Sequence, residues 1–378
     1  MSNKRSIFEE VGAEQPVNTP RGGMIDRGRG GARRAVRIWL MALFALVVAM
    51  IIVGGLTRLT DSGLSITEWK PITGAVPPMS MADWQAEFDK YQEIPEFQQQ
   101  NSWMTLEDFK SIYWWEWGHR QLGRVVGLVW AIGFLGLLAL RKIPTGWTGK
   151  LIIPGALGGV QGAVGWWMVS SGLGHGMLDV ASYRLALHLG LAFVILAVLT
   201  WFIFKLGREE RELMQARRGK EEKLYKLSTG WLHFAGLQIL IGALVAGIDA
   251  GRTYTDWPLM AGGVLPPEMW MTELGWRNLF ENPGLVQFVH RVVGYILLGF
   301  AVMVWVKGRR SANAVTRGAF NAAFLALCVQ VMLGIMTVLY AAQWHVAITH
   351  QIVAVALWVL ILRARFLSLY PVAQSIRG

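Results

Sequence analysis

Four histidines carry the most direct chemical signal in this sequence of 378 residues. His119 and His290 end the similar phrases Glu-Trp-Gly-His and Gln-Phe-Val-His, and each precedes a long apolar segment. His188 and His350 lie in further apolar segments, two segments later in each case. An imidazole within a membrane is costly unless it pairs or faces a polar cavity, so each of these residues is a functional-site candidate.

Imidazoles on two facing helices are suited to bind a heme iron from its two sides. No cysteine, aspartate or glutamate completes a compact metal cage around both pairs, and the single cysteine excludes a disulfide within the chain. We therefore expect two hemes. The predicted iron ligands are His119 with His188 and His290 with His350.

The other basic side chains near these positions have simpler roles. Arg120 and Arg291 directly follow the first histidine of each pair, and we expect their paired N–H donors to bind heme propionates. Anchoring at the membrane interface is the alternative for both arginines. The remaining histidines have no counterpart in the other half and are interpreted as structural or solvated: His175, His233 and His345.

An acidic residue distinguishes the first pair from the second. Glu116 precedes His119 by three residues, and hence lies one helical turn away on the same face, whereas Gln287 precedes His290. A carboxylate can move protons at neutral pH and an amide cannot. The difference predicts chemistry in the first half and electron transfer in the second. The alternative is that Glu116 only orients His119 or is solvated at the helix start.

The segments that position these residues are predicted to be transmembrane helices. The composition is 53% hydrophobic and only 16% charged, which is typical of a membrane protein. A run of about 20 uncharged residues spans a hydrocarbon core of about 30 Å. We expect eight helices, and the chain to be all-α. The uncharged runs are 38–57, 125–140, 151–173, 185–204, 227–248, 292–306 and 318–362, the last divided by a turn near residues 341–345.

The charges predict the orientation of these helices. The segments assigned to the cytoplasm, namely both termini and the connections near residues 141–150, 205–226 and 307–317, contain 26 of the 36 lysines and arginines. Segment 58–118 has ten acidic and four basic residues and is placed outside. All four histidines then lie near the outer ends of their helices. No soluble domain with a basic face is present, which argues against a nucleic-acid partner.

An internal repeat divides the chain into two halves. Residues Ile-Thr-Glu-Trp-Lys-Pro at 66–71, followed by Gly-Ala-Val-Pro-Pro, match Tyr-Thr-Asp-Trp-Pro at 254–258, followed by Gly-Gly-Val-Leu-Pro-Pro. We expect two tandem, pseudo-symmetric four-helix bundles with both termini in the cytoplasm. The predicted parts are a tail at 1–37, a first half at 38–205, a linker at 206–227, a second half at 228–367 and a tail at 368–378.

These motifs resemble those of the heme A synthase family over roughly residues 38–367. The resemblance rests on Gly-Gly-Leu-Thr-Arg-Leu-Thr at 54–60, on Ser-Gly-Leu-Ser at 62–65 and on the two phrases that contain His119 and His290. Some bacterial members have a cysteine pair in the first outer loop, and segment 58–118 has none. The chain is thus closest to the cysteine-free subgroup of proteobacteria and mitochondria, and a disulfide has no redox role here.

The resemblance implies an enzyme that oxidises the C8 methyl of heme O to a formyl group and so makes heme A for cytochrome oxidase. It implies a bacterial inner-membrane protein with its sites toward the periplasm. Heme O would be flanked by His119 and His188, a permanent heme b would be bound by His290 and His350, and Glu116 would be the essential glutamate.

The expected partners are membrane lipid, the heme O substrate, the heme O synthase that supplies it and an unidentified electron donor. A homo-oligomer is compatible with the sequence. Two other functions stay open on the residues alone. A quinol-linked di-heme cytochrome b explains four histidines but not Glu116 opposite Gln287, and it usually has hemes on both sides of the membrane. A porphyrin carrier without catalysis is the third candidate.

Overall fold

The computed structural model describes residues 24–174 and 176–374, and within these ranges the chain is helical, without a β-sheet. Eight of the described helices are long and apolar enough to cross a membrane, which confirms the predicted number. The first 23 residues of the predicted N-terminal tail, His175 and the last four residues lie outside the described residues. The eight helices are α1 (Met24–Leu59), α3 (Leu106–Ala139), α4 (Thr148–Val169), α5 (Ser182–Leu206), α7 (Glu222–Gly247), α9 (Pro283–Gly308), α10 (Ala314–Leu339) and α11 (Trp344–Leu369).

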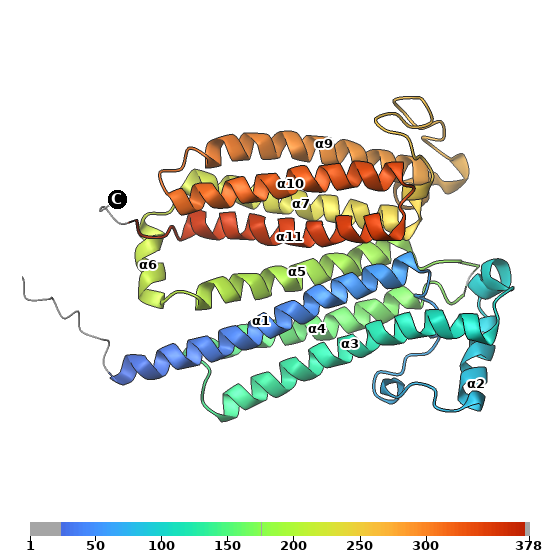
Figure 1. Cartoon of the computed structure of the whole chain (residues 1–378), viewed down its shortest axis with the longest axis horizontal. Helices are drawn as coiled ribbons and strands as arrows, with labels where there is room; N and C mark the ends of the chain where they lie inside the picture. Colours follow the sequence, from blue (N-terminus) through green and yellow to red (C-terminus); the bar gives the residue numbers. More distant parts are fainter. Residues whose placement is uncertain (1–23, 175, 375–378) are drawn as a thin grey trace, which may run out of the picture.

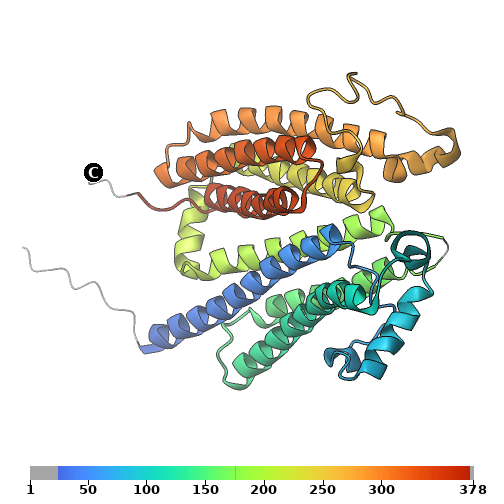
Figure 2. The same ribbon diagram turned by 45° about the vertical axis from the view of Figure 1, so that its right-hand side comes forward.

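The long helices form two neighbouring groups (Figure 1). The first helix group consists of α1, α3, α4 and α5, and the second helix group consists of α7, α9, α10 and α11. The short helix α6 (Glu210–Arg218) connects α5 to α7 at one end of the molecule. The connections 60–105 and 248–282, with helices α2 (Met81–Gln92) and α8 (Asn278–Glu281), lie at the opposite end, which we call the loop end (Figure 2).

Three of the long helices begin much earlier than the uncharged runs predict. The helix expected from residue 125 begins at Leu106, where Thr105 and Asp108 form a reciprocal capping box. The helix expected from residue 292 begins at Pro283, and the Asn282 side chain caps it by accepting from the Leu285 amide. The first helix extends back to Met24. Charge-free runs mark only the part of a helix that lies in lipid, and these caps lie outside that part.

The two groups contact each other through α5 with α7 and through α1 with α11. Near the loop end, the Gln351 side chain of α11 donates a hydrogen bond to the Ile51 carbonyl of α1, with a distance of 2.5 Å. The Arg58 guanidinium at the end of α1 pairs with Asp249, just after α7, at 2.7 Å. The first and last helices of the chain are thus fastened together.

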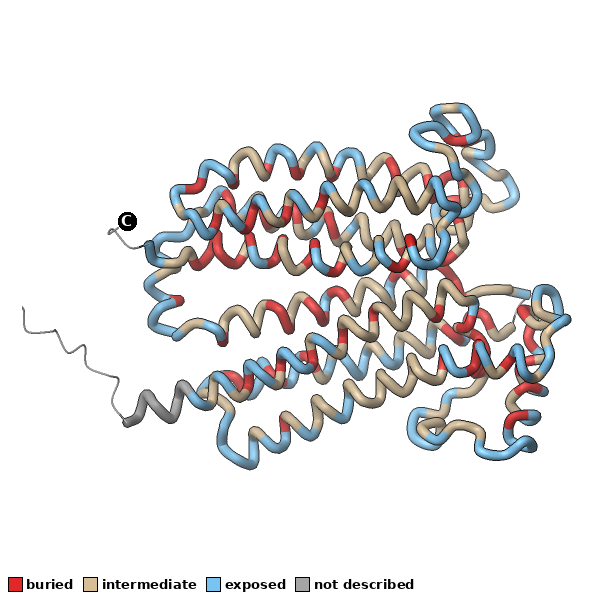
Figure 3. Tube along the Cα trace, viewed as in Figure 1, coloured by how far each residue is buried: buried red, intermediate tan, exposed pale blue. Residues whose placement is uncertain are grey.

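Side chains on the outer faces of both groups are apolar and exposed, as lipid contact requires. Ile132 of α3 and Leu325 of α10 are 70% and 66% exposed. Figure 3 shows exposed and half-buried positions along every long helix. The loop end of the first group has its own buried cluster, which includes Trp84, Tyr91 and Phe109 and packs α2 against α3. We call residues 60–105, packed on α3 in this way, the cap.

Candidate functional site

Each of the four histidines packs against a glycine of a neighbouring helix. The ring of His119 lies on Gly54, so closely that a methyl group on the glycine would be 2.8 Å from the Cε1 atom of the histidine. The same contact has a distance of 2.8 Å between Gly165 and His188. Only a glycine leaves room for an imidazole at this distance. The four helix pairs that make the contact are α1 with α3, α4 with α5, α7 with α9, and α10 with α11.

The second helix group repeats this contact twice. A methyl group on Gly242 would lie 3.0 Å from Cε1 of His290, and one on Gly334 would lie 3.1 Å from Cε1 of His350. His188, His290 and His350 all occur within the first two turns of their helices at the loop end. The structure therefore gathers the histidines toward one end of the molecule.

The two histidines of each predicted pair belong to the same helix group: His119 and His188 to the first, His290 and His350 to the second. No cluster of three or more His, Cys, Asp or Glu side chains with metal-binding geometry occurs among the described residues. The Nδ1 atoms of His119 and His350 are buried without a hydrogen-bond partner. Two imidazoles in each group, each packed on a glycine, and no third metal-binding side chain beside them fit ligation of heme iron and do not fit a compact metal cage.

Three of the four histidines are also held by a glutamine. The Gln161 amide lies 3.2 Å from Nδ1 of His188 and donates to the carbonyl oxygen of the same residue at 3.0 Å. Gln238 makes the same two contacts with His290, at 3.1 and 2.9 Å. Gln330 lies 3.3 Å from Nε2 of His350. These amides restrict the rotation of the rings.

Glu116 is buried at the loop end of α3, with 3% of its surface exposed. Its Oε2 atom accepts hydrogen bonds from the Ser65 hydroxyl and the Ile66 amide, both at 2.7 Å, and its Oε1 atom accepts from Arg120 at 2.5 Å. The carboxylate therefore fastens the cap to α3. The structure excludes the interpretation of a solvated Glu116, and the hydrogen bonds of this carboxylate do not include His119.

Gln287 occupies the corresponding place in the second helix group, and its side chain is also buried. Its amide nitrogen donates to the Tyr254 carbonyl at 2.9 Å, while its Oε1 atom has no partner. The glutamine thus forms one loop contact, whereas the glutamate forms two and also pairs with Arg120 of its own helix. The two positions share a location at the helix start but differ in charge and in the number of bonds.

Arg120 and Arg291 have partners other than those predicted. Arg120 donates to the carbonyl oxygens of Ile66 and Glu68 at 2.7 and 3.0 Å. Arg291 donates to the carbonyl oxygens of Tyr254 and Asp256, at 3.0 Å each, as well as to a third carbonyl nearby. The two guanidinium groups therefore hold the loops against α3 and α9. Most of their N–H donors are used in this way, so propionate binding by these arginines stays a prediction.

His233 and His345 make no comparable contact with a glycine or a glutamine of a neighbouring helix. His233 is exposed, and its Nδ1 atom lies 2.8 Å from the Thr229 carbonyl one turn earlier in the same helix. His345 is exposed in the first turn of α11.

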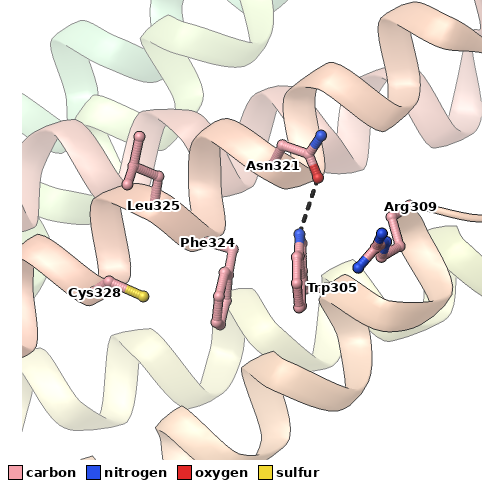
Figure 4. A pocket seen from close by; sticks show the side chains of 6 residues that line it. All are labelled: Trp305, Arg309, Asn321, Phe324, Leu325 and Cys328. Carbon is pink, nitrogen blue, oxygen red and sulfur yellow. Dashed lines mark hydrogen bonds between the residues drawn. The ribbon is translucent and has the colours of Figure 1, made fainter.

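A surface pocket between α9 and α10 is not part of the site (Figure 4). The Trp305 ring stacks on Phe324 with centroids 4.5 Å apart and donates to Asn321 at 2.9 Å. Along α9, fifteen residues separate His290 from Trp305, which corresponds to roughly 22 Å. The pocket also contains none of the four histidines.

Comparison with known proteins identifies the family. The model of a family described as cytochrome oxidase assembly protein matches residues 37–362. The heme A synthase of Ruegeria pomeroyi is 70% identical to this chain, and the alignment covers 100% of both. The chain belongs to the heme A synthase family. Other members include the heme A synthases of Roseobacter denitrificans, 63% identical over 100% of both chains, and of Paracoccus denitrificans, 60% identical over 99% of both.

The site of this heme A synthase family member includes residues that sequence reasoning missed. The sequence alone did not indicate the glycines of neighbouring helices on which the four histidines pack. The missed signal is a short pattern, Gln-x-x-x-Gly, at 161–165, 238–242 and 330–334. Its glutamine and glycine lie one turn apart on the same helix face, which is the face that contacts a histidine.

Proposed function

We propose that the chain oxidises the C8 methyl of heme O, first to a hydroxymethyl group and then to a hydrated aldehyde that loses water, giving heme A. In this proposal heme O binds between His119 and His188, and a permanent heme b binds between His290 and His350. The observation that carries the proposal is the same histidine–glycine contact in four helix pairs, with a buried carboxylate next to only one of them.

Bound heme supplies a redox-active iron, and heme O also supplies the carbon that is oxidised. The protein has to hold the substrate, manage protons and bring electrons. The glycine cradles hold the imidazoles in place, because any larger residue at Gly54 or Gly165 would displace the ring. The cap covers the loop end of the first group and limits the access of water to the substrate edge.

Glu116 is the group assigned to proton handling. Its Oε2 atom accepts from the Ser65 hydroxyl, and the same hydroxyl lies 3.1 Å from the Ser62 carbonyl in the cap. In the proposal, a proton released at the substrate passes to the Glu116 carboxylate, whose hydrogen bond with the Ser65 hydroxyl connects it to the cap. Gln287 cannot act in this way, because an amide does not take up a proton near neutral pH.

The contact between α1 and α11 supports electron transfer between the sites. His350 is followed by Gln351, which donates to the Ile51 carbonyl of α1 and occupies the space that Gly55 leaves open. The neighbouring Gly54 contacts the ring of His119. In the proposal, a heme b held by His290 and His350 would supply redox chemistry at the second site, and this connection would hold the two sites next to each other.

The loop end, with its sites, is assigned to the periplasmic side of the bacterial inner membrane, because the opposite connections contain most of the lysines and arginines. The substrate then comes from a membrane enzyme that produces heme O, and electrons come from a donor outside the chain.

The decisive experiment uses cells that make heme O but no heme A. The full-length chain is expressed in them, and extracted hemes are separated by chromatography. Wild type is expected to yield heme A. Glu116→Gln is expected to keep heme b and to lower heme A by about 100-fold or more, the usual contribution of a positioned acid or base. The matched control is Gln287→Glu, at the corresponding place in the second group.

Normal heme A from Glu116→Gln would remove this residue from the proton pathway. Heme bound without any heme A from wild type would instead favour an electron-transfer cytochrome or a carrier.

A further inference from the structure

Each of the four histidines packs on a glycine, and the residue four positions before that glycine lies on the same face of its helix. In three of the four helices this residue is a glutamine, namely Gln161, Gln238 and Gln330. In α1 the corresponding residue, four positions before Gly54, is Met50. Because residues four positions apart share a helix face, the side chain of Met50 is located where the other helices place an amide.

The glutamines restrain their histidines in two ways. The Gln161 and Gln238 amides each contact both the imidazole and the backbone carbonyl of His188 and His290. The amide nitrogen of each glutamine lies 3.1–3.4 Å from both ring nitrogens of its histidine, so the contact restrains the rotation of the ring, as neighbours of a metal-bound histidine do. A ligand held in this manner binds tightly and exchanges slowly.

Met50 gives His119 no such restraint, because a thioether cannot donate a hydrogen bond. Its methyl group lies against α3, about one turn after the histidine, and a methyl group on Gly123 would be 3.8 Å from it. The Nδ1 atom of His119 is buried and has no partner. Of the two histidines in the first helix group, His188 is anchored by an amide, whereas the hydrogen bonds of the described residues give His119 no amide partner.

The two hemes differ in what they require of their ligands. A permanent heme b stays in the protein, whereas a substrate heme has to enter and its product has to leave in every turnover. We propose that Met50 makes His119 the exchangeable axial ligand of the substrate heme, while Gln161 keeps His188 as the fixed one. This inference rests on the proposed function of the site. Met50 is therefore a positioning residue that acts through His119.

The test compares Met50→Gln with Met50→Leu in the full-length protein that retains its heme b. Ferric heme O is added without oxygen or reductant, its spin state is followed by optical and electron paramagnetic resonance spectra, and its transfer to apomyoglobin is timed. Met50→Gln is expected to shift the added heme toward the low-spin form and to slow its transfer by about tenfold or more, since such neighbours change metal affinity 10- to 100-fold. Met50→Leu is expected to behave as wild type.

A reciprocal variant tests the same idea in the second group. Gln238→Met is expected to speed the loss of heme b to apomyoglobin by about tenfold. Identical spectra and transfer rates for Met50→Gln and Met50→Leu would overturn the inference and leave the proposed function intact. Loss of the added heme in Met50→Leu would also overturn it, because the sulfur would then be a ligand. Failure of wild type to bind any second heme would overturn the assigned function and the inference together.

Discussion

The two helix groups hold their histidines in the same way but differ in what surrounds them. In the first group a carboxylate, Glu116, is buried among three donors, and Met50 leaves one imidazole without an amide partner. In the second group Gln287 makes one loop contact, and each imidazole has an amide neighbour, Gln238 or Gln330. One scaffold can thus hold a cofactor firmly in one place and process a similar molecule in another, through a few side chains.

The sharpest way to separate the groups is to remove one histidine from each. His290→Ala is expected to abolish heme b, because a porphyrin with a single remaining ligand is lost during purification. His119→Ala is expected to keep heme b and to lose heme A formation. Heme content per protein, measured as the pyridine complex, checks both variants. Equal loss of heme b in the two would mean that the groups do not bind separate hemes.

A smaller effect is expected from filling the glycine cradles. Gly242→Ala places a methyl group 3.0 Å from the His290 ring and should lower heme b occupancy about tenfold, since displacing a ligand by a few tenths of an ångström weakens its bond to the metal. Gly54→Ala should spare heme b and reduce heme A yield. Gly299→Ala, where nothing lies within 4 Å, is the control. An equal effect of all three would point to helix packing in general.

The arginines that hold the loops offer a third comparison. Arg120→Gln breaks contacts with the cap and leaves Glu116 without its cation, whereas Arg291→Gln breaks contacts with carbonyl oxygens only. Hydrogen bonds of charged groups contribute about 1.5–3 kcal/mol each. Limited proteolysis should therefore cut within the cap about tenfold faster in Arg120→Gln, and segment 254–263 only a few-fold faster in Arg291→Gln. The reverse order would refute the stronger anchoring of the cap.

The smallest expected effect is a dependence of the stability of the cap on pH. Burial, with the nearby Asp179 charge, raises the pKa of Glu96 in the cap to about 8, while backbone amides of Gly262 and Ala261 lower the pKa of Asp256 in the second loop. Folded Glu96 retains a proton that the unfolded chain releases near pH 4.5. The cap should therefore lose stability from about pH 5 to pH 8 and change little above that.

Proteolysis of the cap at increasing temperature, repeated at pH 5, 6.5 and 8, measures this loss. Glu96→Gln removes the titrating group, so its cap should respond less to pH. An unchanged slope in that variant would assign the pH dependence to another residue.

The sequence predicted the features that depend on neighbouring residues in the chain, and it predicted less well those that depend on packing between distant segments. Charge-free runs indicated eight membrane helices because lipid excludes charge along about 20 consecutive residues. They did not indicate that α3 begins at Leu106, since the caps and pairs that extend it lie outside lipid. The type and order of the histidines pointed to paired ligands. The partners of Arg120 and the amide next to His290 depend on which loop and which helix face are opposite, and this is set by contacts distant in sequence.

The contact of Gln351 with Ile51 joins the last transmembrane helix to the first. The ribosome makes α1 first and α11 last, so this contact forms only when nearly the whole chain has been inserted. Until then α1 lacks the neighbour that Gln351 provides beside Gly55. A chain that ends before α11 would also lack His350, so its second site would be incomplete, which ties the onset of activity to the end of synthesis.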